Sequence, residues 1–152
     1  MKKRTKIWLG VVLGAVAVFH LIWTGNYFLH YRSYTKNVPM HESGHYFLIT
    51  DDYDLSVAMP TYPTFTGNLA ITNKVDDLSF IIWPSIVGSP EIGLQITQSN
   101  GVTYSVILDQ SLNYDNKKNS ADLPKEQLID LMAKCQDEII AMYDYAKKSW
   151  NF

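Results

Sequence analysis

The stretch IWLGVVLGAVAVFHLIW, from Ile7 to Trp23, decides how the rest of the chain is arranged. Among these 17 residues His20 is the only strongly polar one, and no side chain carries a formal charge at pH 7. A helix rises about 1.5 Å per residue and needs about 17–25 apolar residues to cross the hydrocarbon core of a bilayer. The stretch therefore predicts a transmembrane helix over residues 7–25, with the remainder of the chain tethered to a membrane.

Basic residues set the expected orientation of this helix. Four precede the apolar stretch, namely Lys2, Lys3, Arg4 and Lys6. Only Arg32 and Lys36 follow it closely. The positive-inside rule then places residues 1–6 in the cytoplasm and the C-terminal domain outside the cell membrane. We expect a single-pass signal-anchor protein.

Two short patterns within the stretch allow other interpretations. Ala15-Val16-Ala17 imitates the cleavage site of a signal peptide, but cleavage there would leave only Ile7–Gly14 as the apolar region. We therefore expect an uncleaved anchor. Gly10 and Gly14 form a G-x-x-x-G pattern, which lets two membrane helices approach closely. Glycine is common in membrane helices, and we favour this simpler explanation.

Charge is distributed unevenly along the chain. The 116 residues from Asn37 onward contain seven of the 13 basic residues and all 15 acidic residues, a formal net charge of −8. This length predicts one small domain. An acidic surface repels nucleic acid and attracts basic partners, so we expect no nucleic-acid binding.

Short runs of β-branched and aromatic residues alternate with turn formers between residues 45 and 108. Six strands are predicted, over Tyr46–Thr50, Leu55–Met59, Leu69–Thr72, Leu78–Trp83, Ile92–Thr97 and Thr103–Leu108. The connections are too short for crossover helices, so the sheet should be antiparallel, and Asn100-Gly101 is a typical hairpin turn. Residues 26–44 are expected to form a juxtamembrane stalk.

One helix is predicted after the polar loop at residues 113–121, with Asp122 as its N-cap and Pro124 near its first turn. Its apolar residues recur every three or four positions: Leu128, Leu131, Met132, Cys135, Ile139, Met142, Tyr143 and Ala146. Cys135 is the only cysteine and is expected to be a buried, inert thiol. Residues 45–152 should thus form an α+β domain, a meandering six-stranded sheet with one helix on one face.

The segment His41-Glu42-Ser43-Gly44-His45 matches the H-E-x-x-H motif of zinc proteases. That motif requires a helix, which would place His41 and His45 on one face with Glu42 beside the metal. Pro39 upstream, Gly44 within and a predicted strand directly afterwards all oppose a helix. A zinc metalloprotease is therefore a minor alternative, and we expect neither an enzyme nor a bound cofactor.

Two groups of residues are candidates for binding a protein partner. Tyr62 and Phe65 lie in a loop, residues 59–68, whose two prolines pre-order the backbone, and aromatic residues on rigid loops are typical binding anchors. Packing of these rings beneath the loop is an equal alternative. The second group lies in predicted turns: Asp51, Asp52, Asp76 and Asp77. Such turns would steer a basic partner toward the domain, although solvated turns explain them more simply.

The layout of the chain resembles the TipC family of membrane-bound immunity proteins, which protect Gram-positive bacteria against LXG-type toxins acting outside the membrane. The shared features are the KKR start, the single span, the small cysteine-poor outer domain and a C-terminal helix ending YAKKSWNF. The resemblance implies a non-enzymatic inhibitor that binds a cognate toxin by surface complementarity.

The residues themselves favour an anchored extracytoplasmic binding protein, with a basic secreted toxin or an envelope component as its partner. A structural or regulatory accessory protein of the cell envelope, pairing through Gly10 and Gly14, is the alternative.

Overall fold

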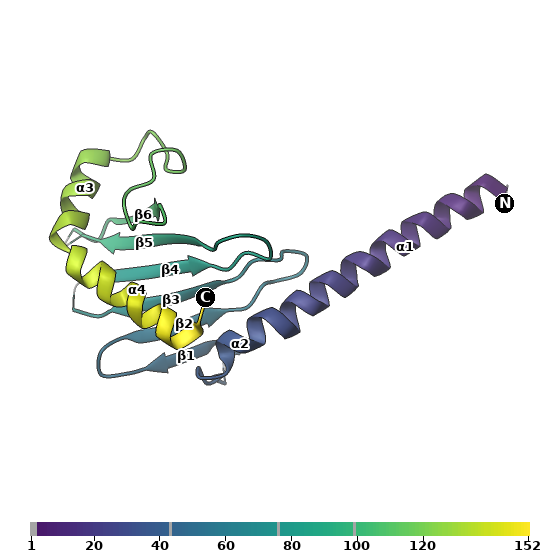
Figure 1. Ribbon diagram of the computed structural model, residues 1–152, viewed down its shortest axis with the longest axis horizontal. Coiled ribbons are helices and arrows are strands. Elements are labelled where there is room, and N and C mark those ends of the chain that lie inside the picture. The colour runs from purple at the N-terminus through teal and green to yellow at the C-terminus, as the bar shows by residue number, and fades with distance from the viewer. Residues whose placement is uncertain (1–2, 43, 76, 99) are drawn as a thin grey trace.

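A long N-terminal helix projects from a body made of one sheet and two further helices, as the computed structural model shows (Figure 1). The structure describes the whole chain except residues 1–2, 43, 76 and 99. The first helix, α1 (Lys3–Gly25), continues through a π-helical turn, η1 (Asn26–His30), into α2 (Tyr31–Thr35). Residues Arg4–Thr35 are long and apolar enough to cross a membrane, by length and composition.

The six predicted strands form one antiparallel sheet in which each strand pairs with its neighbour in sequence. They are β1 (Tyr46–Ile49), β2 (Asp54–Ala58), β3 (Asn68–Asn73), β4 (Leu78–Trp83), β5 (Glu91–Thr97) and β6 (Thr103–Leu108). Every boundary lies within one residue of the prediction, and the α+β class is confirmed.

The strand register defines two ends of this sheet. The β2–β3 and β4–β5 loops lie at one end, where Ala58 pairs with Asn68 and Trp83 with Glu91. We call this end proximal, because the C-terminal end of α1 lies beside it (Figure 1). The β1–β2, β3–β4 and β5–β6 turns lie at the opposite, distal end.

The prediction of one continuous C-terminal helix capped by Asp122 is wrong. The structure has two helices, α3 (Lys125–Lys134) and α4 (Gln136–Trp150), and Pro124 occupies the N-cap of α3. The chain turns at Cys135, where φ is −105° and ψ is 14°, and the Cys135 amide donates to the carbonyls of both Leu131 and Met132. The turn lets α4 cross the sheet, and it leaves Cys135 half-buried instead of fully buried.

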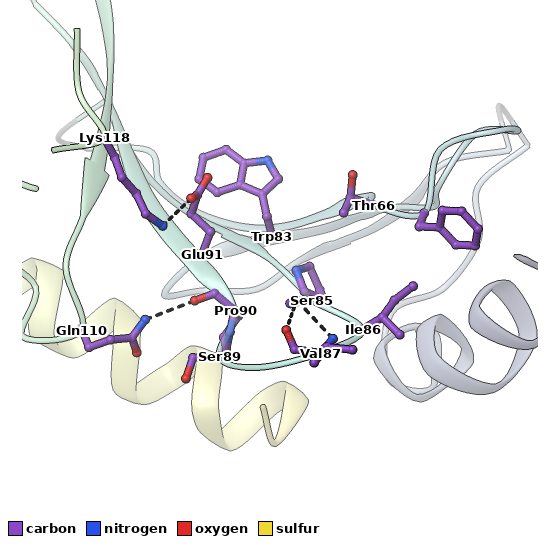
Figure 2. Close-up of a pocket in the computed structure, with 12 residues that line it drawn as sticks. Thr66, Trp83, Ser85, Ile86, Val87, Ser89, Pro90, Glu91, Gln110 and Lys118 are labelled. Carbon is purple, nitrogen blue, oxygen red and sulfur yellow. Dashed lines mark hydrogen bonds and ion pairs between the residues drawn. The ribbon is translucent and has the colours of Figure 1, made fainter. Parts of the chain in front are cut away.

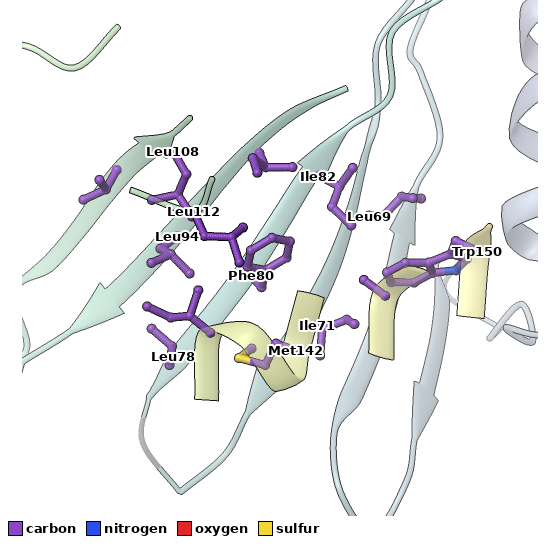
Figure 3. Close-up of a cluster of buried hydrophobic side chains, with 14 of the residues drawn as sticks. Leu69, Ile71, Leu78, Phe80, Ile82, Leu94, Leu108, Leu112, Met142 and Trp150 are labelled. Atoms are coloured by element: carbon purple, nitrogen blue, oxygen red, sulfur yellow. The ribbon is translucent and has the colours of Figure 1, made fainter. Parts of the chain in front are cut away.

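The core lies between the sheet and α4 (Figure 3). Alternate strand residues point toward α4, as the twofold side-chain period of a strand requires. Fully or almost fully buried members are Leu69, Ile71, Leu78, Phe80, Ile82 and Leu94 from the sheet and Ile139, Met142, Ala146 and Trp150 from α4. Burying one such large aliphatic or aromatic side chain stabilises the fold by about 1.5–3 kcal/mol.

The segment predicted to be a stalk contributes to this core. Tyr31, Tyr34 and Val38 are 0%, 7% and 2% exposed and belong to the same buried cluster. Their spacing of three and four residues continues the helical period beyond the apolar stretch, so α2 turns one face toward the domain. The long helix therefore joins the domain through packed side chains, and no free stalk separates them over Tyr31–Val38.

Side-chain and loop contacts occupy part of each outer edge of the sheet. On β6, the side-chain amide of Asn119 accepts from the Ile107 amide and donates to the Ile107 carbonyl, both at 2.7 Å. On β1, the Phe47 amide donates to the Pro39 carbonyl at 3.0 Å. Asn119 thus takes the hydrogen-bonding position that a seventh strand would occupy at Ile107.

Candidate functional site

The sequence-predicted binding residues fall at opposite ends of the sheet. Tyr62 and Phe65 lie in the β2–β3 loop at the proximal end, whereas Asp51, Asp52 and Asp77 lie in turns at the distal end. Asp76 lies outside the described residues. The structure therefore separates the aromatic candidates from the acidic ones.

The aromatic candidates pack against the C-terminal part of α1. The Phe65 ring meets Phe19 edge-on with centroids 5.3 Å apart. The Tyr62 ring lies 5.4 Å from the His20 ring and 5.5 Å from the Trp23 ring. Tyr62 nevertheless remains 56% exposed, because the helix covers only one side of it.

Three hydrogen bonds fix the β2–β3 loop to the continuous helical segment formed by α1, η1 and α2. The Trp23 indole N–H donates to the Thr64 carbonyl at 2.7 Å, and the Asn26 side-chain amide donates to the Phe65 carbonyl at 2.7 Å. The Gly67 amide donates to the hydroxyl of the buried Tyr31 at 2.6 Å. Tyr62 and Phe65 thus belong to a contact between the loop and the N-terminal helix. The sequence places both residues in the loop but does not indicate that they contact this helix.

The acidic candidates flank two neighbouring distal turns. In the β1–β2 turn, the Thr50 hydroxyl donates to the Tyr53 carbonyl at 2.7 Å and accepts from the Tyr53 amide at 3.0 Å, which leaves Asp51 and Asp52 exposed at the tip. Lys74 in the β3–β4 turn contacts Asp54 at the start of β2, with 3.0 Å between nitrogen and oxygen. This ion pair holds the two turns side by side.

A cleft of about 460 Å³ lies between these distal turns and α4. We call it the acidic cleft, and its lining residues are Asp52, Tyr53, Asn73, Glu138, Ala141, Asp144, Tyr145 and Lys148. The Asn73 side-chain amide donates to a Glu138 carboxylate oxygen at 2.8 Å. The Tyr53 and Tyr145 rings meet with centroids 5.0 Å apart. The cleft therefore combines three carboxylates with two aromatic rings.

Its electrostatic environment changes the acidity of Tyr53. Burial raises the pKa of Tyr53 to about 12, and the hydrogen bond to Glu138 and the negative charges of Glu138 and Asp52 act in the same direction. Tyr53 consequently keeps its proton at physiological pH. The cleft offers carboxylate acceptors to cationic groups and aromatic surface to their aliphatic stems.

Sequence reasoning missed the α4 side of this cleft. Glu138, Ala141, Asp144, Tyr145 and Lys148 recur at three- and four-residue steps, which marks them as one helix face. That face borders the apolar stripe, but nothing in the sequence indicates which distal turn it will meet.

The described residues of the H-E-x-x-H segment, His41, Glu42, Gly44 and His45, lie in turn and loop conformation and not in a helix. The His41 amide donates to the His45 carbonyl at 2.9 Å, and the Gly44 amide donates to the His41 carbonyl at 2.8 Å, with Gly44 at a φ of +79°. Met40 then bridges to Tyr46 at the start of β1. Among the described residues no group of three or more His, Cys, Asp or Glu side chains is arranged to hold a metal ion.

A groove of about 780 Å³ lies at the proximal end between the β2–β3 and β4–β5 loops (Figure 2). Its two charged lining residues among those described, Lys118 and Glu91, pair with each other at 2.6 Å. Trp83 forms its aromatic wall and packs over Gly93 of the next strand. Ile86 and Val87 lie on its rim and are 51% and 86% exposed. The groove is therefore lined by polar and apolar side chains in similar proportion.

Comparison of the chain with protein-family models, curated proteins and solved structures gave no match.

Proposed function

We propose that this protein is a single-pass membrane protein whose acidic domain lies outside the cell membrane and binds a basic protein partner through its distal end. A secreted toxin is the partner we favour, so that the protein acts as an immunity protein of a Gram-positive bacterium. The resemblance of its layout to TipC-type proteins is consistent with this role.

The observation that carries the proposal is the position of charge relative to α1. Residues 55–73 and 78–90, which include both proximal loops, contain no charged side chain. The distal turns and the acidic cleft hold Asp51, Asp52, Asp77, Glu138 and Asp144. A domain anchored through α1 would therefore direct its most acidic surface away from the membrane.

The exposed carboxylates of Asp51, Asp52 and Asp77 are available to a partner. The three ion pairs within the described part of the chain join Lys74 to Asp54, Lys118 to Glu91 and Lys134 to Asp130. None of them uses Asp51, Asp52 or Asp77. A surface of one sign raises the association rate with an oppositely charged protein, and added salt reduces that advantage.

The test is protection of cells against the secreted toxin encoded nearest to this gene in its genome. The variant D51N/D52N/D77N removes three negative charges from the distal turns. We expect it to lose protection and to bind the purified toxin at least tenfold more weakly, with the wild-type affinity falling as salt rises.

The matched control is E42Q/D122N/E126Q, which removes the same charge from exposed residues outside the distal turns. It should protect like the wild type. Equal loss of protection in both triple variants would show that toxin binding depends on the net charge of the domain and not on a site at the distal turns. Full protection by D51N/D52N/D77N would contradict the proposed site.

A second candidate function is that of an envelope accessory protein acting through its membrane helix. It is favoured by one observation: residues 4–18 of α1 are exposed throughout, and nothing lies within 4 Å of the positions of added Cβ atoms at Gly10 and Gly14. Exchanging residues 7–18 for an unrelated apolar helix separates the two candidates. An immunity protein should keep its activity after this exchange, whereas an accessory protein that pairs through Gly10 and Gly14 should lose it.

A further inference from the structure

The part of α1 that is free of the domain is too short to cross a bilayer alone. Every residue from Arg4 to Val18 is exposed, and Phe19 is the first that the domain partly covers. The uncovered apolar segment, residues 7–18, is about 18 Å long at a rise of about 1.5 Å per residue. The hydrocarbon core of a bilayer is about 30 Å thick.

The missing length of about 12 Å corresponds to about eight residues of helix, which are residues 19–26. These residues are the ones that contact the β2–β3 loop, through the rings of Phe19, His20 and Trp23 and the side chain of Asn26. A helix that spans the bilayer fully must therefore bring this loop into it.

We propose that the β2–β3 loop, residues 60–67, lies in the outer leaflet of the bilayer beside residues 19–26, where Thr61 and Tyr62 contact lipid. The inference rests on the membrane location given under the proposed function. It adds a second lipid-contacting element, contributed by the folded domain.

The chemistry of the loop suits this position. It carries no charge, and Pro60 and Pro63 have no backbone N–H that would need a partner. Irregular backbone is tolerated at membrane depth only where protein groups satisfy its hydrogen bonds. The helix satisfies the Thr64 and Phe65 carbonyls and the Gly67 amide, and the Thr61 carbonyl accepts from the Thr64 amide within the loop.

The β4–β5 loop extends the same surface. Ile86 and Val87 share a groove with Phe65 and Thr66, so the two loops are neighbours at the proximal end (Figure 2). Val87 is 86% exposed and no charged residue occurs between Leu78 and Pro90. Its side chain is therefore placed to enter the interface next to the β2–β3 loop.

The test uses the full-length protein in vesicles of phosphatidylcholine and phosphatidylglycerol. In a Cys135→Ser background, an environment-sensitive fluorophore is attached at Thr61→Cys, at Val87→Cys, or at Val75→Cys as the control. Val75 is 89% exposed at the distal end. All three labelled proteins should float with the vesicles and keep the circular dichroism of the unlabelled protein.

We expect the labels at positions 61 and 87 to emit at shorter wavelength than the label at 75. Lipids with a nitroxide high on the acyl chain should quench them, and the label at 75 should be unaffected. Solvent-like emission from the label at position 61, in protein that floats with the vesicles, would overturn the placement of the loop and leave the membrane anchor intact. Local thinning of the bilayer around a short span would produce this result. Protein that does not float would overturn the anchor and the loop placement together.

Discussion

The indole of Trp23 donates its N–H to the carbonyl oxygen of Thr64 over 2.7 Å, and the two residues are 41 positions apart in sequence. One belongs to the apolar helix and the other to the first loop at the proximal end of the sheet. This bond, with the neighbouring ring contacts of Tyr62, makes the helix and the domain one packed unit. Its energetic contribution can be measured.

Replacing Trp23 with phenylalanine keeps an aromatic ring but removes the donor to Thr64. We expect the free energy of unfolding in detergent to fall by about 0.5–1.5 kcal/mol, the usual net contribution of one hydrogen bond. Chemical denaturation followed by far-UV circular dichroism measures the change. Trp8→Phe is the matched control, because Trp8 is 70% exposed on the uncovered part of α1. An equal loss in both variants would show that the bond contributes nothing specific.

Met142 tests the packing of α4 on the sheet. Its side chain is fully buried, so Met142→Ala should lower the free energy of unfolding by about 2–5 kcal/mol through lost burial and the remaining cavity. Ile140→Ala, at a position 42% exposed on the same helix, should change it far less. Similar denaturation midpoints for the two variants would contradict the observed orientation of α4.

Gly93 tests the contact between β5 and Trp83. A Cβ atom added there would lie 2.6 Å from the Val106 carbonyl oxygen and 2.9 Å from a ring carbon of Trp83. Gly93→Ala should therefore cost about 1–3 kcal/mol of stability, as overpacking usually does. Gly10→Ala, where nothing lies within 4 Å, should leave the unfolding of the domain unchanged. A neutral Gly93→Ala would mean that both the Val106 backbone and the Trp83 ring shift without cost.

The raised pKa of Tyr53 in the acidic cleft leads us to expect a loss of stability at high pH. The pKa of Tyr53 is raised from 10.0 to about 12, so the folded state holds this proton more tightly than the unfolded state does. The resulting stabilisation is complete below pH 10 and is lost as the pH rises through about 12. Other tyrosines and the lysines titrate in the same range, so the measured quantity is the difference between wild type and Tyr53→Phe.

Stability of Tyr53→Phe should decline less between pH 10 and pH 12 than that of the wild type. The ultraviolet absorbance of tyrosinate provides an independent readout, since the wild type should show one more late-titrating tyrosine than the variant. Parallel stability curves for the two proteins would indicate that Tyr53 ionises alike in the folded and unfolded states.

The sheet could be predicted from the sequence because its determinants are local. Alternating runs such as Leu78–Trp83 and Thr103–Leu108 end at turn formers, and the observed strands have the same boundaries. The connections between the strands are too short for crossover helices, so an antiparallel meander is the simplest topology. The long apolar helix was predicted from equally local information, the run of apolar residues from Ile7 to Trp23, which only His20 interrupts.

The remaining features depend on contacts that no local pattern encodes. The turn at Cys135 has neither glycine nor proline, and it arises where α4 must change direction to cover the sheet. Tyr31 and Tyr34 lie in the segment predicted to be a stalk, yet tertiary packing buries them in the core. The contact of Glu138 with Asn73 joins residues 65 positions apart, so only the packing of α4 on the sheet brings them together.

The hydrogen bonds at the sheet edges limit how another protein can engage this domain. Recognition by strand addition requires a row of unpaired amides and carbonyls along an outer strand. Asn119 already occupies both backbone groups of Ile107 on β6, and Pro39 occupies the Phe47 amide on β1. A peptide docking at either position must first displace these groups. The same contacts leave fewer unpaired backbone groups at the two edges for strand pairing between copies of this chain.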